Sequence, residues 1–345
     1  MLSAGAVAVA VGDTLVGCSG ASDDTSASLD TTASNATGGP PPTGISLDNG
    51  TASSPNPFIT PVDDFFIIDT AYGAPDIDAA SWTLTVKGLV DTPLTLTLDD
   101  LQAYEFIERT ITIGCVSNEV GGGLIGNAVW GGVRLKDVLD DAGVQPTAEQ
   151  VFSTSVDGWT CGFPVGIALD GRDCLIATTM NGEPLTPKHG YPARLIVPGL
   201  YGYISATKWI ETIELNRWSD ASGYWVPLGW SRDAPVKTSS RIDVPREGET
   251  LREGANTLAG VAWAPHTGIG AVEVRIDDGE WRAAVLGDED IDDAWRTWTF
   301  AWNATAGDHT VEVRTIDKSG YTQTDERADV MPDGATGLHR INFSA

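Results

Sequence analysis

The part of the chain that follows Pro235 consists of short stretches in which apolar and polar residues alternate. The side chains of a strand point alternately to two faces, so this pattern is typical of strands that bury one face. The strands are expected in NTLAGVAWAP, AVEVRIDDGEWRAAVL, RTWTFAW and HTVEVRTID, with Asp278-Gly279 as a hairpin turn. Their regular spacing predicts a β-sandwich of the immunoglobulin type over residues 233–345.

The preceding part, residues 57–232, mixes strands with helices. Alternation predicts a strand at residues 82–86 and another at 94–96, followed by a helix from about Leu98 with Thr97 as its N-cap. The stretch VRLKDVLDDAGV has apolar residues at helical spacing from Val133, and Gly143 should end that helix. We therefore expect an α+β chain, with a mixed α/β domain before the sandwich. A chain of 345 residues suits two domains that each bury a core.

The charge of the chain excludes several classes of partner. Asp and Glu number 48 against 21 Lys and Arg, which gives a net charge of −27. Such a surface repels phosphate backbones and anionic lipids, so we expect no binding to nucleic acid. Molar salt shortens the Debye length to about 3 Å and relieves the self-repulsion. The charge therefore predicts a halophilic protein of haloarchaeal origin.

The start of the chain is apolar and is followed by a long polar stretch. Residues 1–18 suit a signal with a lipobox, LVGC at Leu15 to Cys18, or the remnant of a membrane segment. Residues 19–56 are rich in Ser, Thr, Asp and Pro and are expected to form a disordered linker. Four sequons, the first at Asn35, agree weakly with export. We expect an exported protein, tethered to the outer side of a membrane by its N-terminus.

The cysteines are few and widely spaced. Cys18, Cys115, Cys161 and Cys174 form no CxxC pair, and this spacing argues against a zinc ribbon. Cys161 and Cys174 are either core thiols or partners in a disulfide, because spacing alone does not decide between the two. Any metal chemistry must therefore use few protein ligands.

Cys115 lies in ERTITIGCVSNEVGGGLIGNAVWGGVRL, at the end of a β-branched run and directly before a glycine-rich turn. Thiolate is a soft metal ligand and a nucleophile, and a cysteine that leaves a strand into a turn has an accessible sulfur. Asn118 and the glycines at 121–123 would let the main chain approach a bulky ligand closely. Cys115 is therefore the candidate ligand of a redox metal.

A second segment, MNGEPLTPKHGYPARLIVPGLYGYISATKWI, gathers basic residues around a glycine-rich loop. His189, Arg194 and Lys208 lie within twenty residues of each other in a chain that is otherwise strongly acidic. This grouping predicts a buried anion, most simply a phosphate. A redox ligand and a phosphate site together indicate a phosphorylated metal cofactor.

These two segments resemble the molybdopterin-binding domain of the sulfite oxidase family, and the sandwich resembles the dimerisation domain that follows it in that family. The resemblance runs from Pro57 to the C-terminus. It implies a molybdenum-molybdopterin cofactor, with Cys115 as the only protein ligand of the metal and a catalytic residue. It also implies that Asn118, His189, Arg194 and Lys208 hold the cofactor, and that the sandwich forms a homodimer.

The chain departs from the family where relatives bind an oxyanion. Glu119 and Val120 stand where sulfite oxidases carry arginines, and Ile68 and Ile269 replace two further arginines. Trp230 aligns with an active-site tyrosine and is our candidate for that catalytic position. Each lost charged hydrogen bond would cost an anionic substrate about 1.5–3 kcal/mol in a desolvated pocket. The resemblance therefore implies a pocket for a substrate that is not anionic.

The expected activity is a two-electron oxygen-atom transfer on an unidentified substrate. The sequence holds no haem-binding CxxCH, so we expect electrons to pass to or from an external carrier. A genuine sulfite oxidase or dehydrogenase and a methionine-sulfoxide-type reductase remain alternatives. A cofactor-less extracellular binding module is the alternative from another class.

Overall fold

A computed structural model describes residues 57–71 and 73–345. The predicted signal or membrane remnant, with its lipobox at Cys18, and the predicted linker up to residue 56 lie outside the described residues. Within the described part of the chain, no helix is both long and apolar enough to cross a membrane.

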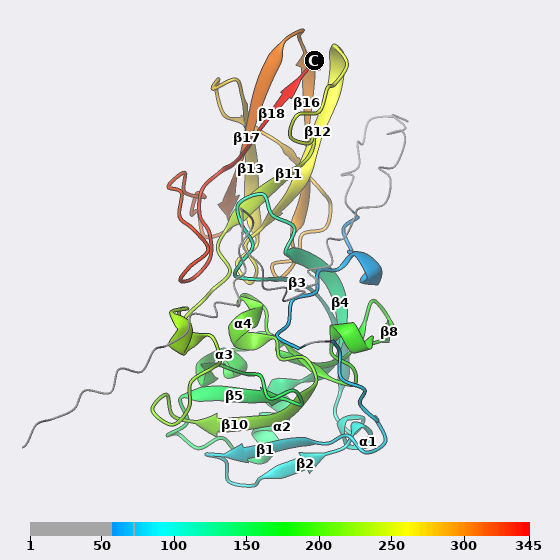
Figure 1. The fold of residues 1–345 in the computed structure, drawn as a ribbon, viewed down its shortest axis with the longest axis vertical. Helices are drawn as coiled ribbons and strands as arrows, with labels where there is room; N and C mark the ends of the chain where they lie inside the picture. The colour runs from blue at the N-terminus through cyan, green and yellow to red at the C-terminus, as the bar shows by residue number, and fades with distance from the viewer. Residues whose placement is uncertain (1–56, 72) are drawn as a thin grey trace, which may run out of the picture. The chain divides into compact units, whose positions relative to one another are not determined.

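The first sheet has five strands, and two helices share its apolar core (Figure 1). Its pairs are antiparallel except for β1 and β10, which run parallel. Apolar side chains of α2 (Leu135–Ala142) and α3 (Val165–Leu169) join its core. In sheet order the strands are β2 (Leu94–Leu96), β1 (Leu84–Gly88), β10 (Ile210–Asn216), β5 (Gln150–Ser155) and β6 (Thr160–Pro164).

The second sheet is antiparallel and is built on a long hairpin. β3 pairs with β4 in a register that sets Gly114 opposite Ile125, so residues 115–124 form the turn of this hairpin. Trp130 and Ile111 are fully buried in its core. The strands are β3 (Phe106–Gly114), β4 (Ile125–Arg134), β7 (Leu175–Met180) and β8 (Glu183–Pro184), with β9 (Arg194–Ile196) paired to β7.

The last part of the chain forms two four-stranded sheets that share one apolar core (Figure 1). Inward residues of both sheets meet there, among them Trp298, Val313 and Phe343. One of these sheets, in strand order, is β11 (Ser239–Val244), β12 (Gly254–Trp263), β16 (Arg296–Ala304) and β15 (Val285–Leu286). The sheet that faces it is β14 (Arg282–Ala283), β13 (Ile269–Ile276), β17 (Asp308–Asp317) and β18 (His339–Ser344).

The predicted helix ends are largely confirmed. Thr97 caps α1 (Leu98–Leu101) through a capping box with Asp100, and α2 ends at Gly143 in a left-handed conformation with φ of +71°. The predicted start of α2 was wrong, because Val133 still belongs to β4 and pairs with β3 and β7. The other short helices are η1 (Val62–Asp64), η2 (Pro187–His189), α4 (Gly202–Ser205) and η3 (Val226–Leu228).

Helices contribute less to the fold than an α+β prediction suggests. The longest helix among the described residues has 8 residues, and the described chain is mostly sheet. The predicted hairpin turn at Asp278-Gly279 is shifted by one residue. Its two central residues are Asp277 and Asp278, with φ of 51° and 54°, and Gly279 donates its N–H to Ile276. Consecutive left-handed residues are typical of a type I′ hairpin, so the turn chemistry was right and its position was not.

Cys161 and Cys174 are both buried thiols, so the alternative of a disulfide between them is wrong. Burial raises the pKa of the Cys161 thiol to about 11 and that of Cys174 to about 12. Thiols with such a raised pKa are poor nucleophiles at neutral pH, and these two act as core residues.

The two parts of the described chain share core and hydrogen bonds. Trp263 and Trp295 of the sandwich belong to the apolar core of the first sheet. Leu200 forms an isolated bridge with Pro235, and the N–H of Thr112 donates to the carbonyl of Asp293 at 2.8 Å. Contacts place the whole described chain in one compact unit, and the boundary between residues 232 and 233 stays a prediction.

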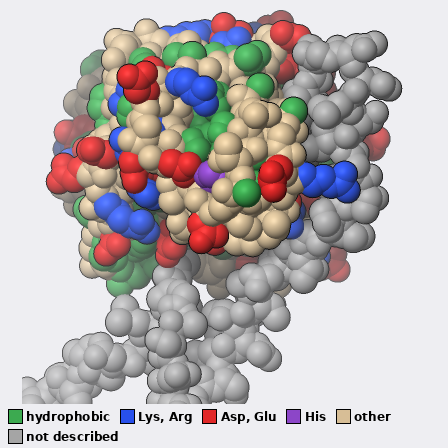
Figure 2. All heavy atoms as spheres, turned by 90° about the horizontal axis from the view of Figure 1, so that it is seen from above, with side chains coloured by type: hydrophobic (Ala, Val, Ile, Leu, Met, Phe, Trp, Pro, Cys, Tyr) green, Lys and Arg blue, Asp and Glu red, His purple; other side chains and the backbone are tan. Residues whose placement is uncertain are grey.

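Charge is spread over the surface without a basic patch on the face that Figure 2 shows, where acidic and basic side chains lie among one another. Most basic side chains are also paired, as in the contacts of Arg134 with Glu105 and Asp173. The exclusion of nucleic acid as a partner stays a prediction.

Candidate functional site

Cys115 follows directly on β3, as predicted, and is partly exposed at the start of the hairpin turn. Its N–H donates to the carbonyl of Leu124 at 2.9 Å, and its own carbonyl accepts from the N–H of Asn118 at 3.0 Å. The Asn118 side-chain oxygen accepts from the N–H of Leu124 at 2.7 Å. Asn118 therefore ties the two ends of the turn together and fixes the main chain that carries the cysteine.

Gly121 and Gly122 of this turn face protein atoms, contrary to the expectation that they admit a ligand, whereas a Cβ on Gly123 would meet nothing within 4 Å. Gly121 has φ of +80°, and a side chain there would meet the ring of His339 at 2.3 Å. The carbonyl of Gly122 accepts from the Arg241 guanidinium at 3.0 Å. Both partners belong to the sandwich, and no residue pattern near the turn indicated them. Gly121 therefore allows close packing of the turn on the sandwich.

The structure brings His189, Arg194 and Lys208 together, as the second segment predicted. Arg194 donates from Nη1 to the carbonyl of His189 at 3.1 Å. Gly190 lies between Arg194 and Lys208, because a Cβ at this position would be 3.1 Å from the Cβ of each. The φ of Gly190 is +104°, which favours glycine there. We refer to His189, Arg194 and Lys208 as the basic cradle.

Burial sets the charges of the cradle. It lowers the pKa of His189 to about 4, helped by the charge of Arg194, so the imidazole is neutral at pH 7 and its Nε2 donates to the Val62 carbonyl at 3.0 Å. Burial lowers the pKa of Arg194 to about 9, which still leaves it charged. Burial also lowers the pKa of Lys208, and the adjacent Asp69 carboxylate opposes this shift. The cradle therefore offers two cations and a neutral imidazole.

Arg194 has an unused donor inside the protein. The residue is 5% exposed, its guanidinium lies 5.0 Å from the ring centre of Trp130, and Nη2 donates to the carbonyl of Ala206 at 3.3 Å. Its buried Nε has no hydrogen-bond partner within the described residues. A buried donor on a charged group without a partner is unfavourable and indicates a missing acceptor.

Helix α4 links the cysteine to the cradle. At its start, a Cβ on Gly202 would lie 3.7 Å from the carbonyl oxygen of Gly114, the residue before Cys115. At its end, the carbonyl of Ala206 accepts the hydrogen bond from Arg194. The two predicted parts of the site therefore lie at the two ends of one short helix.

A small hollow of about 10 Å³ lies beside the cysteine turn. Within the described chain its lining includes no Lys, Arg or His. It shares Ser239 and Ala335 with a larger cavity of about 310 Å³. The lining residues are Gly114, Asn118, Glu119, Val120, Ile125, Tyr201, Ser239, Trp263 and Ala335.

Tyr201 is a candidate site residue that the sequence did not single out. Burial raises its pKa to about 12, the main-chain N–H of Lys237 donates to its hydroxyl, and the charge of Cys115 acts on it. The only signal in the sequence was its place in the PGLYG stretch, directly before α4. Tyr201 therefore stays protonated near the cysteine at neutral pH.

The predicted substrate residues are only partly brought together. Glu119 and Val120 line the hollow, whereas Ile269 is a buried core residue of β13 and Ile68 is 39% exposed. Trp230 lies with the rings of Tyr203 and Trp225, at 5.7 and 6.4 Å between centroids, and it does not line the hollow. Its catalytic role stays a prediction that the described geometry does not support.

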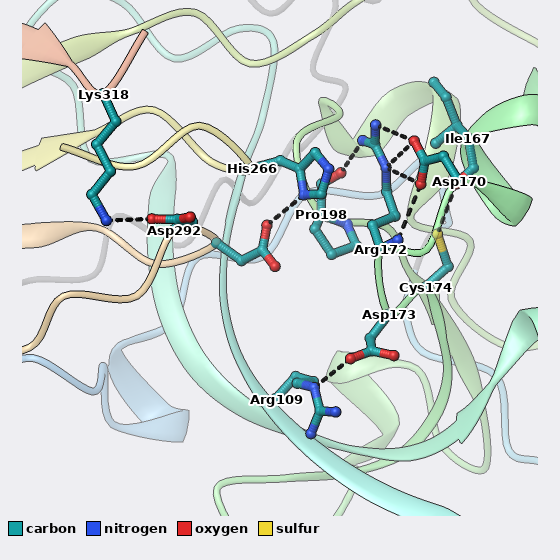
Figure 3. A network of polar contacts seen from close by, with 11 residues as sticks. Arg109, Ile167, Asp170, Arg172, Asp173, Cys174, Pro198, His266, Asp292 and Lys318 are labelled. Atoms are coloured by element: carbon teal, nitrogen blue, oxygen red, sulfur yellow. Dashed lines mark hydrogen bonds and ion pairs between the residues drawn. The ribbon is translucent and has the colours of Figure 1, made fainter.

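A polar network holds the segment that leads to Tyr201 (Figure 3). Arg172 donates to Asp170 at 2.7 Å and to the carbonyl of Pro198 at 2.8 Å, and His266 lies beside them. Gly199 has φ of +83° and leaves room for both neighbours, since a Cβ there would lie 3.0 Å from that of His266 and 3.1 Å from Arg172 Nη1. A loop of the sandwich therefore helps to position the residues before α4.

Comparisons with known proteins place the chain among oxidoreductases. Residues 71–225 match the model of the oxidoreductase molybdopterin binding domain. The chain is 30% identical over 326 residues to human mitochondrial sulfite oxidase, which covers 79% of this chain and 58% of that protein. It is 38% identical over 153 residues to the uncharacterized oxidoreductase YuiH of Bacillus subtilis, covering 44% of this chain and 74% of YuiH.

A solved structure shares the fold. The sulfane dehydrogenase SoxCD from Paracoccus pantotrophus superposes with a TM-score of 0.72 at 24% identity, over 82% of this chain and 80% of that one. The matched range, residues 71–225, includes Cys115 and all three residues of the basic cradle. The chain belongs to the sulfite oxidase family of oxidoreductases, which share a molybdopterin-binding domain.

Proposed function

We propose that this protein is an oxidoreductase that depends on molybdenum-molybdopterin and catalyses a two-electron oxygen-atom transfer on a substrate that is not anionic: a substrate that gains oxygen gives up two electrons, and one that loses oxygen takes up two. The observation that carries the proposal is the buried guanidinium of Arg194, whose Nε lacks a partner. A protein that keeps such a donor in its interior is built to receive an anion there.

The residues present fit the cofactor. Cys115 offers a soft sulfur ligand on a turn that is held by two hydrogen bonds between main-chain groups and by one that the Asn118 side-chain oxygen accepts from the N–H of Leu124. Arg194 and Lys208 offer cations for the phosphate, and His189 offers a neutral imidazole whose Nε2 donates to the Val62 carbonyl. When bound, the cofactor supplies the two-electron redox chemistry, and the protein supplies orientation and electrostatics.

Tyr201 is our candidate for the residue that orients substrate. Its hydroxyl already accepts from the N–H of Lys237, so the phenol proton is available to donate to an oxygen of a bound molecule. The raised pKa keeps that proton in place at neutral pH. We therefore assign to Tyr201 the substrate-orienting role that the sequence predicts for Trp230.

The hollow of about 10 Å³ has room for about one water molecule, so its lining describes the surroundings of a substrate and not a complete pocket. Glu119 contributes a carboxylate, and Val120, Ile125 and Trp263 contribute apolar surface. An anion such as sulfite that is placed beside these residues would meet a like charge and no cation from them, at a cost in binding free energy. A neutral oxide, such as a sulfoxide, meets no such repulsion. The sulfite oxidase among the relatives keeps sulfite as the alternative substrate.

The test uses the full chain, purified in molar salt from a host that makes the cofactor. We expect about one molybdenum per chain by metal analysis, and reduction of methionine sulfoxide or dimethyl sulfoxide that exceeds sulfite oxidation. Fast sulfite oxidation with a low KM would contradict the neutral substrate and favour a genuine sulfite oxidase. Absence of molybdenum would favour the cofactor-less binding module.

The remaining features of the proposal concern assembly, electron transfer and location. The sandwich is of the immunoglobulin type and forms a homodimer, and electrons pass to or from a separate carrier. The protein works outside the cytoplasm of a halophile, attached to the membrane by its N-terminus. The net charge of −27 and the polar stretch at residues 19–56 support this setting. Light scattering at several salt concentrations would test the dimer and the need for salt.

A further inference from the structure

Lys208 of the basic cradle is already paired with a carboxylate. Its Nζ lies 2.6 Å from Asp69 Oδ2 and also donates to the carbonyl of Lys188 at 3.1 Å. The side chains of Lys208 and Asp69 are 10% and 20% exposed, so water screens the pair only weakly. The cation best placed to bind a phosphate beside Arg194 therefore has a competitor built into the chain.

Asp69 lies at the end of a segment that covers the cradle, which we call the N-terminal strap (Phe58–Asp69). Three of its carbonyls accept hydrogen bonds from the body of the protein. Phe58 accepts from Asn127 at 2.8 Å, Thr60 from Asn181 at 3.0 Å, and Val62 from His189. The first part of the strap is therefore fixed to the second sheet and to the cradle.

The last part of the strap is packed less closely. Phe65 is 3% exposed and lies edge-on to Trp130 and to the His189 ring, with centroids 5.7 and 5.9 Å apart. Ile67 and Ile68, by contrast, are 37% and 39% exposed. Asp69 can therefore leave Lys208 by rotation of exposed residues, without disturbing the core contacts of Phe65.

We propose that Asp69 is a placeholder for the phosphate of the cofactor: it neutralises Lys208 while no anion is bound, and competes with a phosphate monoester for that lysine. This inference rests on the proposed function. It assigns the strap a role in cofactor loading and retention.

The charges explain why competition is expected. A buried ammonium is unfavourable without a counter-ion, and Asp69 supplies one. An ammonium has three donors, and Asp69 and the Lys188 carbonyl use two of them. A phosphate at the third donor would bring a second anion close to the carboxylate in a weakly screened site, and like charges there repel. Binding of phosphate and the pairing of Asp69 with Lys208 therefore oppose each other.

The main experiment measures binding of inorganic phosphate to the full chain purified from a host that makes no cofactor. Titration calorimetry at constant ionic strength compares the natural chain with Asp69→Asn. We expect phosphate to bind about tenfold more tightly to the variant, since removal of one competing charge at this range is worth at least that factor. Equal or weaker binding by Asp69→Asn would overturn the proposal, because Asp69 would then merely hold Lys208 in place.

Three matched variants define the cause. Asp64→Asn removes an exposed carboxylate of the same strap and should leave phosphate binding unchanged. Asp69→Glu keeps the competing charge and should bind phosphate like the natural chain. Asp69→Asn combined with Lys208→Gln should lose the gain, and a gain that survives loss of Lys208 contradicts the competition.

A second readout uses the chain loaded with cofactor. After dilution, molybdenum should be lost at least several-fold more slowly from Asp69→Asn than from the natural chain, and faster loss would contradict a placeholder. If no molybdenum is present in any preparation from a host that makes the cofactor, the proposed function fails, whereas the phosphate titration still decides the role of Asp69.

The natural chain provides a test that does not depend on the folding of a variant. If phosphate displaces Asp69, endoproteinase Asp-N should cut before Asp69 faster when phosphate is present than in chloride of equal ionic strength. Mass spectrometry identifies the cut. A rate that is unchanged or lower in phosphate would overturn the proposal.

Discussion

The hydroxyl of Thr112, three residues before Cys115, accepts a hydrogen bond of 2.6 Å from the main-chain N–H of Trp295. The same hydroxyl donates to Asn127 Oδ1 at 3.0 Å, and the Thr112 N–H donates to the carbonyl of Asp293. Thr112 is buried, so these bonds exchange little with water. The strand that presents the cysteine is therefore fixed to the sandwich as well as to its own sheet.

Replacement of Thr112 by valine should destabilise the protein. The shape is kept, but the Trp295 N–H loses its acceptor and the Asn127 oxygen loses its donor, at about 1–3 kcal/mol for each buried group left unpaired. Urea unfolding of the full chain measures the change. Thr110→Val, two residues earlier on the same face and only partly buried, is the control. Equal losses for the two variants would show that the Thr112 bonds add nothing specific.

Replacement of Cys115 by serine tests the metal ligand. The side chain is partly exposed, so the fold should survive, whereas turnover should fall by at least about 100-fold because the hard hydroxyl replaces a soft thiolate. The visible spectrum should lose its sulfur-to-metal bands. Cys174→Ser, in the core, is the control and should keep the spectrum. A variant at 115 with unchanged metal load and unchanged spectrum would disprove the ligand.

Arg194→Lys tests the anion site without removing its charge. Lysine cannot reproduce the planar set of donors that reaches the His189 and Ala206 carbonyls and leaves Nε for a ligand. We expect cofactor content to fall by about tenfold, as measured by metal analysis and by fluorescence of the oxidised pterin. Arg109→Lys, which changes a partly exposed pair with Asp173, should keep its cofactor.

Local patterns in the sequence were sufficient for several parts of this molecule. The capping box at Thr97, the helix end at Gly143 and the position of Cys115 after a strand all depend on neighbouring residues. The cradle could be predicted because its three members are close in sequence and unusual in so acidic a chain. These features are encoded within a few residues of where they act.

Contacts between distant segments were not accessible in this way. Asp69 meets Lys208 across 139 residues, and Arg241 meets Gly122 across 119. Nothing near Gly121 in the sequence indicates that His339 packs against it, so the prediction of room for a ligand fails there, whereas open space lies beside Gly123. Trp230 was aligned by position in sequence, whereas the hollow takes Tyr201 from a different segment. Long-range packing decided each of these points.

Tyr201→Phe and Trp230→Phe separate the two candidates for the substrate-orienting residue. If the Tyr201 hydroxyl donates to the reacting oxygen, its loss should lower kcat by about 100-fold with little change in cofactor content. Trp230→Phe should change kcat less than severalfold, because that ring contacts Tyr203 and Trp225. Turnover of dimethyl sulfoxide measures both. The reverse order of effects would restore Trp230 as the catalytic residue.

The neutral state of His189 should make the stability of the protein depend on pH. In the folded chain its pKa is about 4, lowered by burial from the ordinary 6.5, so the unfolded chain binds this proton first as the pH falls. The imidazole therefore contributes stability that is present above pH 6.5 and is lost as the pH falls toward 4, up to about 3 kcal/mol. As the pH falls, the free energy of unfolding should thus decrease more steeply for the natural chain than for His189→Gln, and the difference between them isolates this residue from the many carboxylates.

His309 contributes with the opposite sign. Hydrogen bonds to the Thr305 carbonyl and to Asp277 raise its pKa, so its contribution to stability is present below pH 6.5 and is lost as the pH rises. The matching comparison for His309 uses His309→Gln. If the difference in unfolding free energy between the natural chain and each variant changes with pH in the same direction for both, His189 is protonated in the folded cradle and the site holds three cations.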